Sequence, residues 1–253
     1  MLELHNASLR YQDGPWLFRG LSFRLDAGAS CVLLGPNGTG KTSLMKAILG
    51  TCRLNAGSVM STVTPAHVPQ SLDPVFDFSV RDIVLMGATA RHGSRLLSRP
   101  RAADYRRTDD ALEQVGLAGF AARTFGSLSG GERQLALLAR AVATGSSLII
   151  LDEPTAALDL ANEERVLTML ETLKAGGATL LMSSHTPDHA LRLADRVLML
   201  HRDGSFRFGS ARECLRDEEL TRLYGISLTV RAHEDEDGLH ATVVRRRQRG
   251  SLS

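Results

Sequence analysis

Three short stretches of the sequence carry residues suited to phosphate chemistry. In the first, GPNGTGKT, glycines let successive backbone N–H groups surround an anion, Lys41 adds a cation, and the Thr42 hydroxyl can bind Mg²⁺. The motif fits G-x-x-x-x-G-K-[ST] at every position, between a predicted strand, CVLL, and a predicted helix, SLMKAILG. We therefore predict a phosphate-binding loop made of Gly35, Pro36, Asn37, Gly38, Thr39, Gly40, Lys41 and Thr42.

The second stretch, LIILDEP, ends a predicted buried strand in two acids. Asp152 is suited to the Mg²⁺ shell, and Glu153 could orient an attacking water or accept its proton. His185 ends a third predicted buried strand, TLLMSS, and should reach the same carboxyl edge of the sheet, beside the γ-phosphate. Alone, two acids or a histidine at a strand end would be structural, but a phosphate loop in the same sheet favours catalytic roles.

The third stretch, SLSGGERQ, has the spacing of a capping box at the start of the predicted helix ERQLALLARAVA. Capping explains Ser129 and Glu132. It does not explain the glycines Gly130 and Gly131, each of which costs about 1 kcal/mol of helix propensity relative to alanine. Close approach by an external group would explain them, and a helix start suits an anion.

The surrounding elements predict an α/β fold. The strands CVLL, LIIL and TLLMSS alternate with helices such as ANEERVLTMLETLKAGG, which predicts a parallel sheet covered on both faces. The runs LELHNASLRY and LSFRL near the start predict strands of a partly exposed sheet. Residues 79–144 hold helix-like runs and no clear strand, so we predict a helical subdomain inserted in the core.

Composition excludes several classes of protein. The chain has 253 residues, 43% of them apolar, and a formal net charge of +2, which does not mark a nucleic-acid binder. Its three cysteines form no CxxC pair, and we see neither a secretory signal nor an apolar run near the ~18 residues of a membrane span. We expect a soluble cytoplasmic chain. The arginine-rich segment 91–107 is either a solvated surface or a docking surface, and the charged tail from 231 is expected to be partly disordered.

The order of GPNGTGKT, Gln70, LSGGERQ, LIILDEP, ALD and His185 closely resembles the ATP-binding cassette of ABC transporters over about residues 1–228, leaving 229–253 as a tail. The resemblance implies a P-loop NTPase core, RecA-like, with an antiparallel β subdomain and a helical subdomain at about 79–144. It also implies ATP and Mg²⁺ as cofactors. In this family two cassettes, here expected to be a homodimer, close head to tail, so that Ser129–Glu132 of one caps the ATP of the other.

The resemblance also implies roles for single residues. Glu153 would be the catalytic base, while Lys41 and His185 would hold the γ-phosphate. Gln70 would contact Mg²⁺ with Thr42 and Asp152, and would sense the permease. Further nucleotide contacts and the link between the two sites are expected at Tyr11, which would stack on adenine, at Ser43 and at Asp159.

The subtype follows from longer stretches. FSVRDIVLMGATARHG, LDEPTAALDLANEERVL, ADRVLML and LTRLYGI resemble importer cassettes for iron chelates, haem and vitamin B12. SSHTPDHALRLADRV resembles relatives for iron complexes or molybdate, most of which have Asp where Thr186 stands. The resemblance implies an energy-coupling ATPase at the cytoplasmic face of the membrane, with a separate permease, an extracytoplasmic binding protein and no nucleic acid.

Two alternatives stay open. A soluble cassette ATPase acting on ribosomes or nucleic acid would make use of the arginine-rich segment 91–107. A regulatory subunit with little turnover is the other alternative, and the presence of Glu153 and His185 counts against it.

Overall fold

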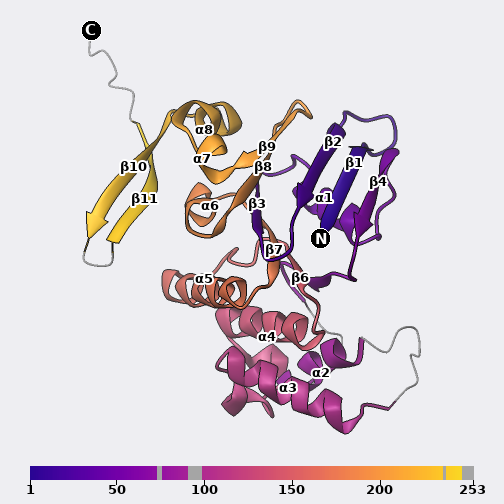
Figure 1. Ribbon diagram of the computed structural model, residues 1–253. Coiled ribbons are helices and arrows are strands. Elements are labelled where there is room, and N and C mark those ends of the chain that lie inside the picture. Colours follow the sequence, from indigo (N-terminus) through magenta and orange to yellow (C-terminus); the bar gives the residue numbers. More distant parts are fainter. Residues whose placement is uncertain (73–75, 91–98, 236–237, 247–253) are drawn as a thin grey trace. The chain divides into compact units, whose positions relative to one another are not determined.

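The computed structural model describes residues 1–72, 76–90, 99–235 and 238–246, so residues 91–98 of the arginine-rich segment 91–107 lie outside the described residues. The chain divides into two compact units. The first comprises Met1–Thr62 and Leu181–Ser253, and the second is Val63–Leu180. The boundary passes through strand β7, Thr179–Ser184 (Figure 1). Each unit is described by itself below.

An antiparallel sheet with the strand order β2-β1-β4 forms one part of the first unit. Its apolar residues alternate along the strands, so that Leu2 and Leu4 are buried while their neighbours face outward. Both strands predicted near the start of the chain are confirmed. The three strands are β1, Leu2–Leu9; β2, Phe18–Leu25; and β4, Ala56–Ser61.

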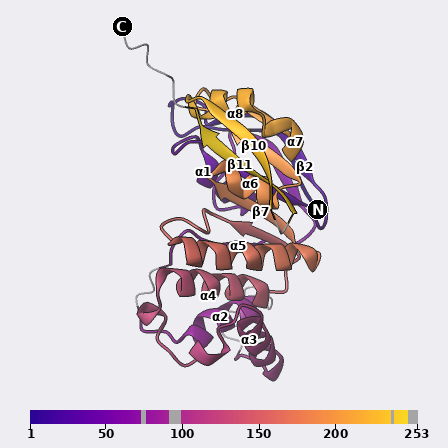
Figure 2. The same ribbon diagram turned by 90° about the vertical axis from the view of Figure 1, so that its left-hand side faces the viewer.

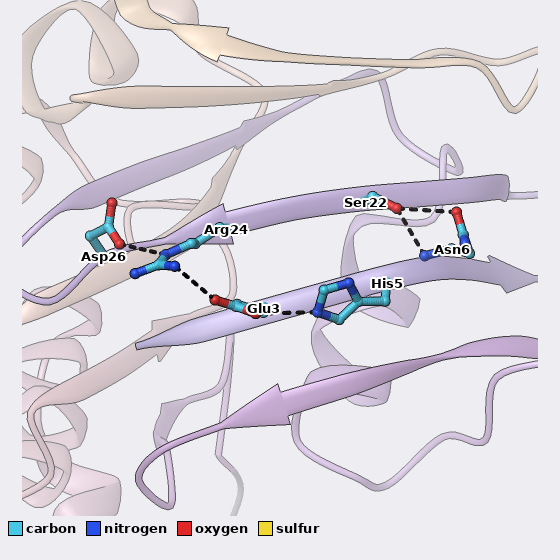
Figure 3. Close-up of polar contacts among 6 residues, drawn as sticks. All are labelled: Glu3, His5, Asn6, Ser22, Arg24 and Asp26. Atoms are coloured by element: carbon cyan, nitrogen blue, oxygen red, sulfur yellow. Dashed lines mark hydrogen bonds and ion pairs between the residues drawn. The ribbon is translucent and has the colours of Figure 1, made fainter.

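The exposed face of this sheet carries a row of polar side chains (Figure 3). Arg24 contacts Glu3 Oε1 at 3.2 Å and Asp26 Oδ1 at 2.7 Å. The main-chain N–H of Asn6 donates to Ser22 Oγ at 2.8 Å. Exposed ion pairs contribute only about 0–1 kcal/mol each, so this face is a solvated surface and not a candidate site.

A second sheet of the first unit positions the phosphate-binding loop. Its strand order is β7-β3-β8-β9, and β3 is parallel to β8. All five residues of β3 are buried, as expected for a strand in the interior of a parallel sheet. The edge strand β9 runs antiparallel to β8, so the sheet is mixed where the sequence predicted a parallel one. The reason is the short 201–205 connection, which closes a hairpin and leaves no room for a crossover. The elements are β3, Ser30–Leu34; α1, Lys41–Ile48; α6, Pro187–Leu193; β8, Arg196–Leu200; and β9, Phe206–Ser210.

The end of the first unit is more ordered than expected for a charged tail. After two helices the chain forms an antiparallel hairpin, β10–β11, in which Leu228 pairs with Arg245 and Asp235 with Gly238. Residues 236–237 and 247–253 of the predicted tail lie outside the described residues. The elements are α7, Ala211–Cys214; α8, Asp217–Tyr224; β10, Leu228–Asp235; and β11, Gly238–Arg245.

The second unit combines two parallel strands and the start of β7 with four helices. Figure 2 shows α4 between α5 on one side and α2 and α3 on the other, and the helices contact one another in that order. The helices predicted between residues 79 and 144 are confirmed. The elements are β5, Ala66–Val68; α2, Val80–Ala90; α3, Ala102–Gln114; α4, Gly130–Ala143; β6, Leu148–Leu151; α5, Leu160–Ala175; and two 3₁₀ turns at Ala118–Phe120 and Phe125–Ser127.

Across the described ranges, no helix combines the length and the apolar character needed to cross a bilayer.

Candidate functional site

The loop between β3 and α1 has a backbone that requires its glycines. Gly38 and Gly40 have φ angles of 83° and 97°, in the left-handed region that side chains disfavour. A Cβ on Gly35 would lie 2.6 Å from the carbonyl oxygen of Leu200 and 2.7 Å from Thr39 Oγ1. Gly40 is the N-cap of α1 and offers no side chain to the first turn of the helix. The loop is therefore shaped so that an anion can approach the start of α1.

Lys41 lies at the base of this loop and is only 5% exposed. Its Nζ donates to the carbonyl oxygens of Gly35, at 2.8 Å, and of Pro36, at 3.3 Å. Thr39 Oγ1 donates to the same Pro36 oxygen at 3.0 Å, which tightens the turn. The ammonium group is thus held inside the curl of the loop, where it can exchange a carbonyl partner for a phosphate oxygen. Thr42 is exposed at the start of α1.

Tyr11 is joined to the same helix. Its hydroxyl donates to Ser43 Oγ at 3.1 Å, although the two residues lie far apart in the sequence. The side chain is 53% exposed, so a ring face is open beside the phosphate-binding loop. Phe18 belongs to the core, with no exposed surface. Trp16 is half-buried, with the guanidinium of Arg10 4.8 Å from the centre of its ring.

In the second unit, two predicted site residues follow the parallel strands β5 and β6. Val68 pairs with Leu151, and the main-chain N–H of Asp152 donates to the Val68 carbonyl oxygen at 2.9 Å. Gln70 and Glu153 therefore come two residues after paired positions, at the same carboxyl edge. The structure brings these two predicted residues together, and it buries Asp152 next to them.

Glu153 has a φ of 45°, which is uncommon for a residue with a side chain. Its carbonyl oxygen accepts from the N–H of Ala156 at 3.0 Å, so the chain turns sharply after β6. Holding a non-glycine residue in this conformation costs about 1–3 kcal/mol, and such residues cluster at functional sites. The half-buried Glu153 side chain is therefore held in place by the turn after β6.

The predicted capping box at the start of α4 is confirmed. Ser129 Oγ accepts from the Glu132 N–H at 3.3 Å, and Glu132 Oε2 accepts from the Ser129 N–H at 2.7 Å. These hydrogen bonds to the Ser129 main chain and side chain lower the pKa of Glu132 below its ordinary value. Two main-chain N–H groups at the start of α4, those of Ser129 and Glu132, thus have acceptors from side chains of the same segment.

The two glycines after this cap have different reasons for being glycine, which corrects the expectation that one external group explains both. Gly131 is buried against α5, and a Cβ there would overlap the side chain of Asn162, whose own Cβ would be 2.6 Å away. Gly130 is exposed, and a Cβ there would meet only Leu158 Cδ2 at 3.5 Å, an ordinary contact. Helix packing explains Gly131, so only Gly130 leaves room for an external group.

Asp159 is the N-cap of α5. Its Oδ1 accepts from the N–H of Asn162 at 2.8 Å, and its Oδ2 accepts from Asn162 Nδ2 at 3.0 Å. Asn162 therefore lies between Asp159 and Gly131. Sequence reasoning missed Asn162, although an Asp followed three residues later by Asn at the start of a helix is a local signal of a cap.

The predicted metal ligands are chemically suited to Mg²⁺. Thr42, Gln70 and Asp152 offer hydroxyl, amide and carboxylate oxygens, the donors that this ion prefers beside phosphates and water. Among the residues that the structure describes, no group of three or more His, Cys, Asp or Glu side chains could hold a metal ion by itself.

The predicted site residues divide between the units. The phosphate-binding loop, Tyr11 and His185 belong to the first unit. Gln70, Asp152, Glu153, Asp159 and the residues at the start of α4 belong to the second. His185 follows β7 directly and has an exposed side chain.

The comparisons with known proteins all match this chain to ABC transporters or to ATP-binding proteins of transport systems. A family profile described as ABC transporter matches residues 18–156. The chain is 38% identical over 228 residues to the molybdate import ATP-binding protein MolC of Haemophilus influenzae, covering 90% of this chain and 89% of that protein. It is 35% identical over 238 residues to the manganese transport system ATP-binding protein MntB of Bacillus subtilis, covering 90% and 94%.

A solved structure extends the likeness to the whole fold. It is described as an inward-facing conformation of a putative metal-chelate type ABC transporter, and one of its chains matches this one with a TM-score of 0.91 at 35% identity, covering 98% of each chain. This likeness confirms the predicted fold class, a P-loop NTPase with an antiparallel β subdomain and a helical subdomain.

Proposed function

We propose a function for this chain from one premise: it belongs to the ABC transporter family, whose profile covers more than half of its residues. The chain is an ATPase that hydrolyses ATP to drive transport. From this premise we infer the residues that carry the reaction, the way two chains cooperate, and the class of cargo.

The first unit supplies the primary nucleotide site. ATP phosphates occupy the loop Gly35–Thr42, with Lys41 and the open start of α1 as the positive partners, and Ser43 and Tyr11 beside them. The observation that carries this assignment is the buried Lys41 ammonium inside a loop with an uncapped helix start. Mg²⁺ bound by Thr42, Gln70 and Asp152 would neutralise phosphate charge during the reaction. Glu153 orients and deprotonates the attacking water, and His185 holds the γ-phosphate.

The start of α4 contacts the nucleotide that is bound by a second copy of the chain. Ser129, Gly130, Gly131 and Glu132 cap the ATP of the partner in a head-to-tail homodimer, and Asp159 links the two sites. The exposure of Gly130 supports this assignment, because a Cβ there would meet only Leu158 Cδ2, at 3.5 Å, among the residues that the structure describes. Each site is therefore complete only in the dimer, which couples closure of the two chains to ATP binding.

The cargo is a metal-containing compound or a related oxyanion taken up by an importer. The relatives named for molybdate and manganese transport and the metal-chelate type structure support this class. An iron chelate, haem, cobalamin or molybdate fits it. The chain would act at the cytoplasmic face of the membrane, with separate permease subunits and an extracytoplasmic binding protein, and without nucleic acid.

Gln70 connects hydrolysis to the permease. It lines a cavity of about 320 Å³ together with Gly130, Arg133 and Gln134 at the start of α4. Replacing Gln70 by Ala should reduce transport more than it weakens ATP binding. The reason is that Gln70 lines this cavity and is not part of the phosphate-binding loop. Equal loss of both would contradict this role.

The shared-site mechanism is tested with Glu153→Gln, which removes the base and keeps the size of the side chain. At saturating ATP and Mg²⁺ this variant should form a stable dimer by light scattering, whereas the wild type hydrolyses ATP and returns to monomer. The control is Glu153→Gln with Lys41→Ala, which should need a much higher ATP concentration to dimerise because Lys41→Ala weakens nucleotide binding. A Glu153→Gln chain that stays monomeric with ATP bound would contradict the mechanism.

The transport role is tested by capture of the tagged chain from gently solubilised native membranes. A polytopic permease among the captured proteins supports the importer, and an accompanying binding protein identifies the cargo class. Ribosomal proteins or nucleic acid without a membrane partner would instead favour a soluble cassette ATPase.

A further inference from the structure

The chain directly after β7 is held from its interior side by Ser184. Ser184 Oγ accepts from the main-chain N–H of Thr186 at 2.9 Å and forms a hydrogen bond with His189 Nδ1 at 2.8 Å. Both Ser184 and His189 are buried. These two hydrogen bonds span His185, so its backbone is fixed while its side chain stays exposed.

The opposite side of the same turn is held by Tyr224, the last residue of α8. Its hydroxyl donates to the main-chain carbonyl oxygen of His185 at 3.0 Å. Burial of the phenol, together with the negative charge of Asp188, raises the pKa of Tyr224. The hydroxyl therefore keeps its proton at neutral pH and remains a donor. Tyr224 lies 39 positions along the chain from His185, so this contact is set by tertiary structure alone.

The β10–β11 hairpin is fastened to the helix that follows His185. Asp188, in the first turn of α6, accepts at the same Oδ1 from Thr242 Oγ1 and from the main-chain N–H of Val243, both at 2.8 Å. The other strand is held by Asp217 of α8, whose Oδ1 accepts from the Val230 N–H at 2.8 Å. Figure 1 shows the hairpin beside α6 and α8, in agreement with the contacts between these elements.

A small cavity lies where these elements meet. It has a volume of about 200 Å³, and its lining includes His185, Asp188, Tyr224 and Val243. The turn that carries His185 thus has neighbours on α8 and on β11, and removal of either neighbour would let it move into this space. None of these contacts is explained by nucleotide binding alone.

We propose that Tyr224 and the β10–β11 hairpin form a C-terminal brace that fixes the backbone of His185 for the hydrolysis step. This inference rests on the proposed role of His185 in holding the γ-phosphate. Tyr224 and Asp188 are then positioning residues, because both act through the turn that carries His185. The C-terminal segment of the chain therefore affects turnover more than it affects nucleotide affinity.

The test compares Tyr224→Phe with wild type in steady-state ATP hydrolysis. Loss of the hydroxyl should lower kcat roughly five- to tenfold and change KM for ATP by a smaller factor, because a misplaced His185 loses more contact with the γ-phosphate in the transition state than in the ground state. Asp188→Ala should act in the same direction, and Asp188→Asn should restore most of the rate because it keeps an acceptor for the hairpin. The matched control is Tyr105→Phe, which removes a hydroxyl from an exposed tyrosine of α3.

A cycle of variants separates positioning from general damage. In a His185→Ala background, Tyr224→Phe should lower kcat no further, because the residue that it positions is gone. A further loss of several-fold in that background would mean that Tyr224 supports the fold in general, and would overturn the brace.

A second measurement needs no catalysis. Hydrogen exchange of the main-chain N–H groups of residues 185, 186, 188 and 189 should become at least several-fold faster in Tyr224→Phe than in wild type, with the amides of β3 unchanged. Unchanged exchange at 185–189 would overturn the brace whether or not the chain hydrolyses ATP. If wild type hydrolyses ATP, His185→Ala slows hydrolysis and Tyr224→Phe does not, the brace fails while the proposed function stands. If wild type shows no hydrolysis and exchange still accelerates, the proposed function fails and the physical brace remains.

Discussion

Two helices of this molecule begin where an anion could bind, and they begin in different ways. α1 starts at Gly40, which is in the left-handed region, and no side chain caps its first turn. α4 starts at Ser129, which is extended, and Ser129 and Glu132 each accept a main-chain N–H there. The first turn of any helix has N–H groups without partners inside the helix. At α4 the chain supplies acceptors for two such groups, whereas at α1 the cap supplies none.

The difference indicates a division of labour between the two starts. α1 combines an uncapped helix end with the buried ammonium group of Lys41, so it can bind phosphate by itself. α4 is already stabilised, and Gly130 is the position at which its surface stays open. It is suited to add contacts to a phosphate that another chain already holds. The predictions below test this division, from the largest expected effect to the smallest.

The largest effect is expected from Lys41→Ala. Loss of the charge-assisted contacts should weaken ATP binding by about 2–3 kcal/mol, which is roughly a hundredfold in Kd. Titration calorimetry on the isolated chain measures this directly. Ser129→Ala is the matched comparison at the other helix and should leave the Kd of the isolated chain unchanged. If both variants weaken binding equally, the two helix starts are equivalent and the division of labour is wrong.

The next effect separates the two glycines of α4. Gly131→Ala places a methyl group against Asn162 and should reduce the free energy of unfolding by about 1–3 kcal/mol, measured by urea denaturation. Gly130→Ala has room for its methyl group and should leave stability equal or higher, because alanine favours a helix.

The same pair differs in the dimer. In a Glu153→Gln background, Gly130→Ala should weaken the ATP-dependent dimer by about 1.4 kcal/mol, or tenfold, through contact with the partner.

Asn162→Gly should partly rescue the stability of Gly131→Ala, since it removes the atoms that the new methyl group would meet. Equal stability of the two alanine variants would contradict the packing explanation.

Ser129→Ala should have a smaller effect on the fold. Loss of the cap should cost about 1 kcal/mol of stability. Because the pKa of Glu132 is lowered in the folded chain, the contribution of the box is present at neutral pH and is lost as the pH falls below the ordinary pKa of a glutamate. Urea denaturation at pH 7 and at pH 4 should therefore show a smaller difference between variant and wild type at pH 4.

The control for this prediction is the similar box at the start of α7. There Ser210 and Glu213 make the same pair of hydrogen bonds, at 3.3 Å and 2.8 Å. Ser210→Ala should also cost stability, but only Ser129→Ala should weaken the ATP-dependent dimer. A dimer that is insensitive to Ser129→Ala would leave this box with a capping role alone.

The smallest effect is expected from Tyr11→Phe. It removes the hydrogen bond to Ser43 and keeps the ring, so the Kd for ATP should change by less than about fivefold, the worth of one such bond. Tyr11→Ala should weaken binding more, because it also removes the stacking surface. If the phenylalanine variant loses as much as the alanine variant, the hydroxyl and not the ring carries the contact.

Much of the site could be predicted because its signals are local. The glycines of the phosphate-binding loop, the strand that ends at Asp152 and the box of Ser129 with Glu132 each depend on residues within a few positions of one another. Backbone conformation and capping operate over that range, so residue type and spacing were sufficient. The antiparallel edge strand β9 and the hairpin β10–β11 were missed, although each involves pairing with the strand directly before it, because the strand propensity of a segment depends strongly on its context.

The sequence by itself determined the phosphate chemistry, the helical segment between residues 79 and 144, and the family. Only the tertiary structure decided why Gly131 is a glycine, since its reason is Asn162 on another helix. It also decided that Tyr11 is tied to Ser43 and that Tyr224 holds the backbone of His185. These contacts join residues more than thirty positions apart. Packing of whole elements brings such residues together, and no short pattern of residue types records it.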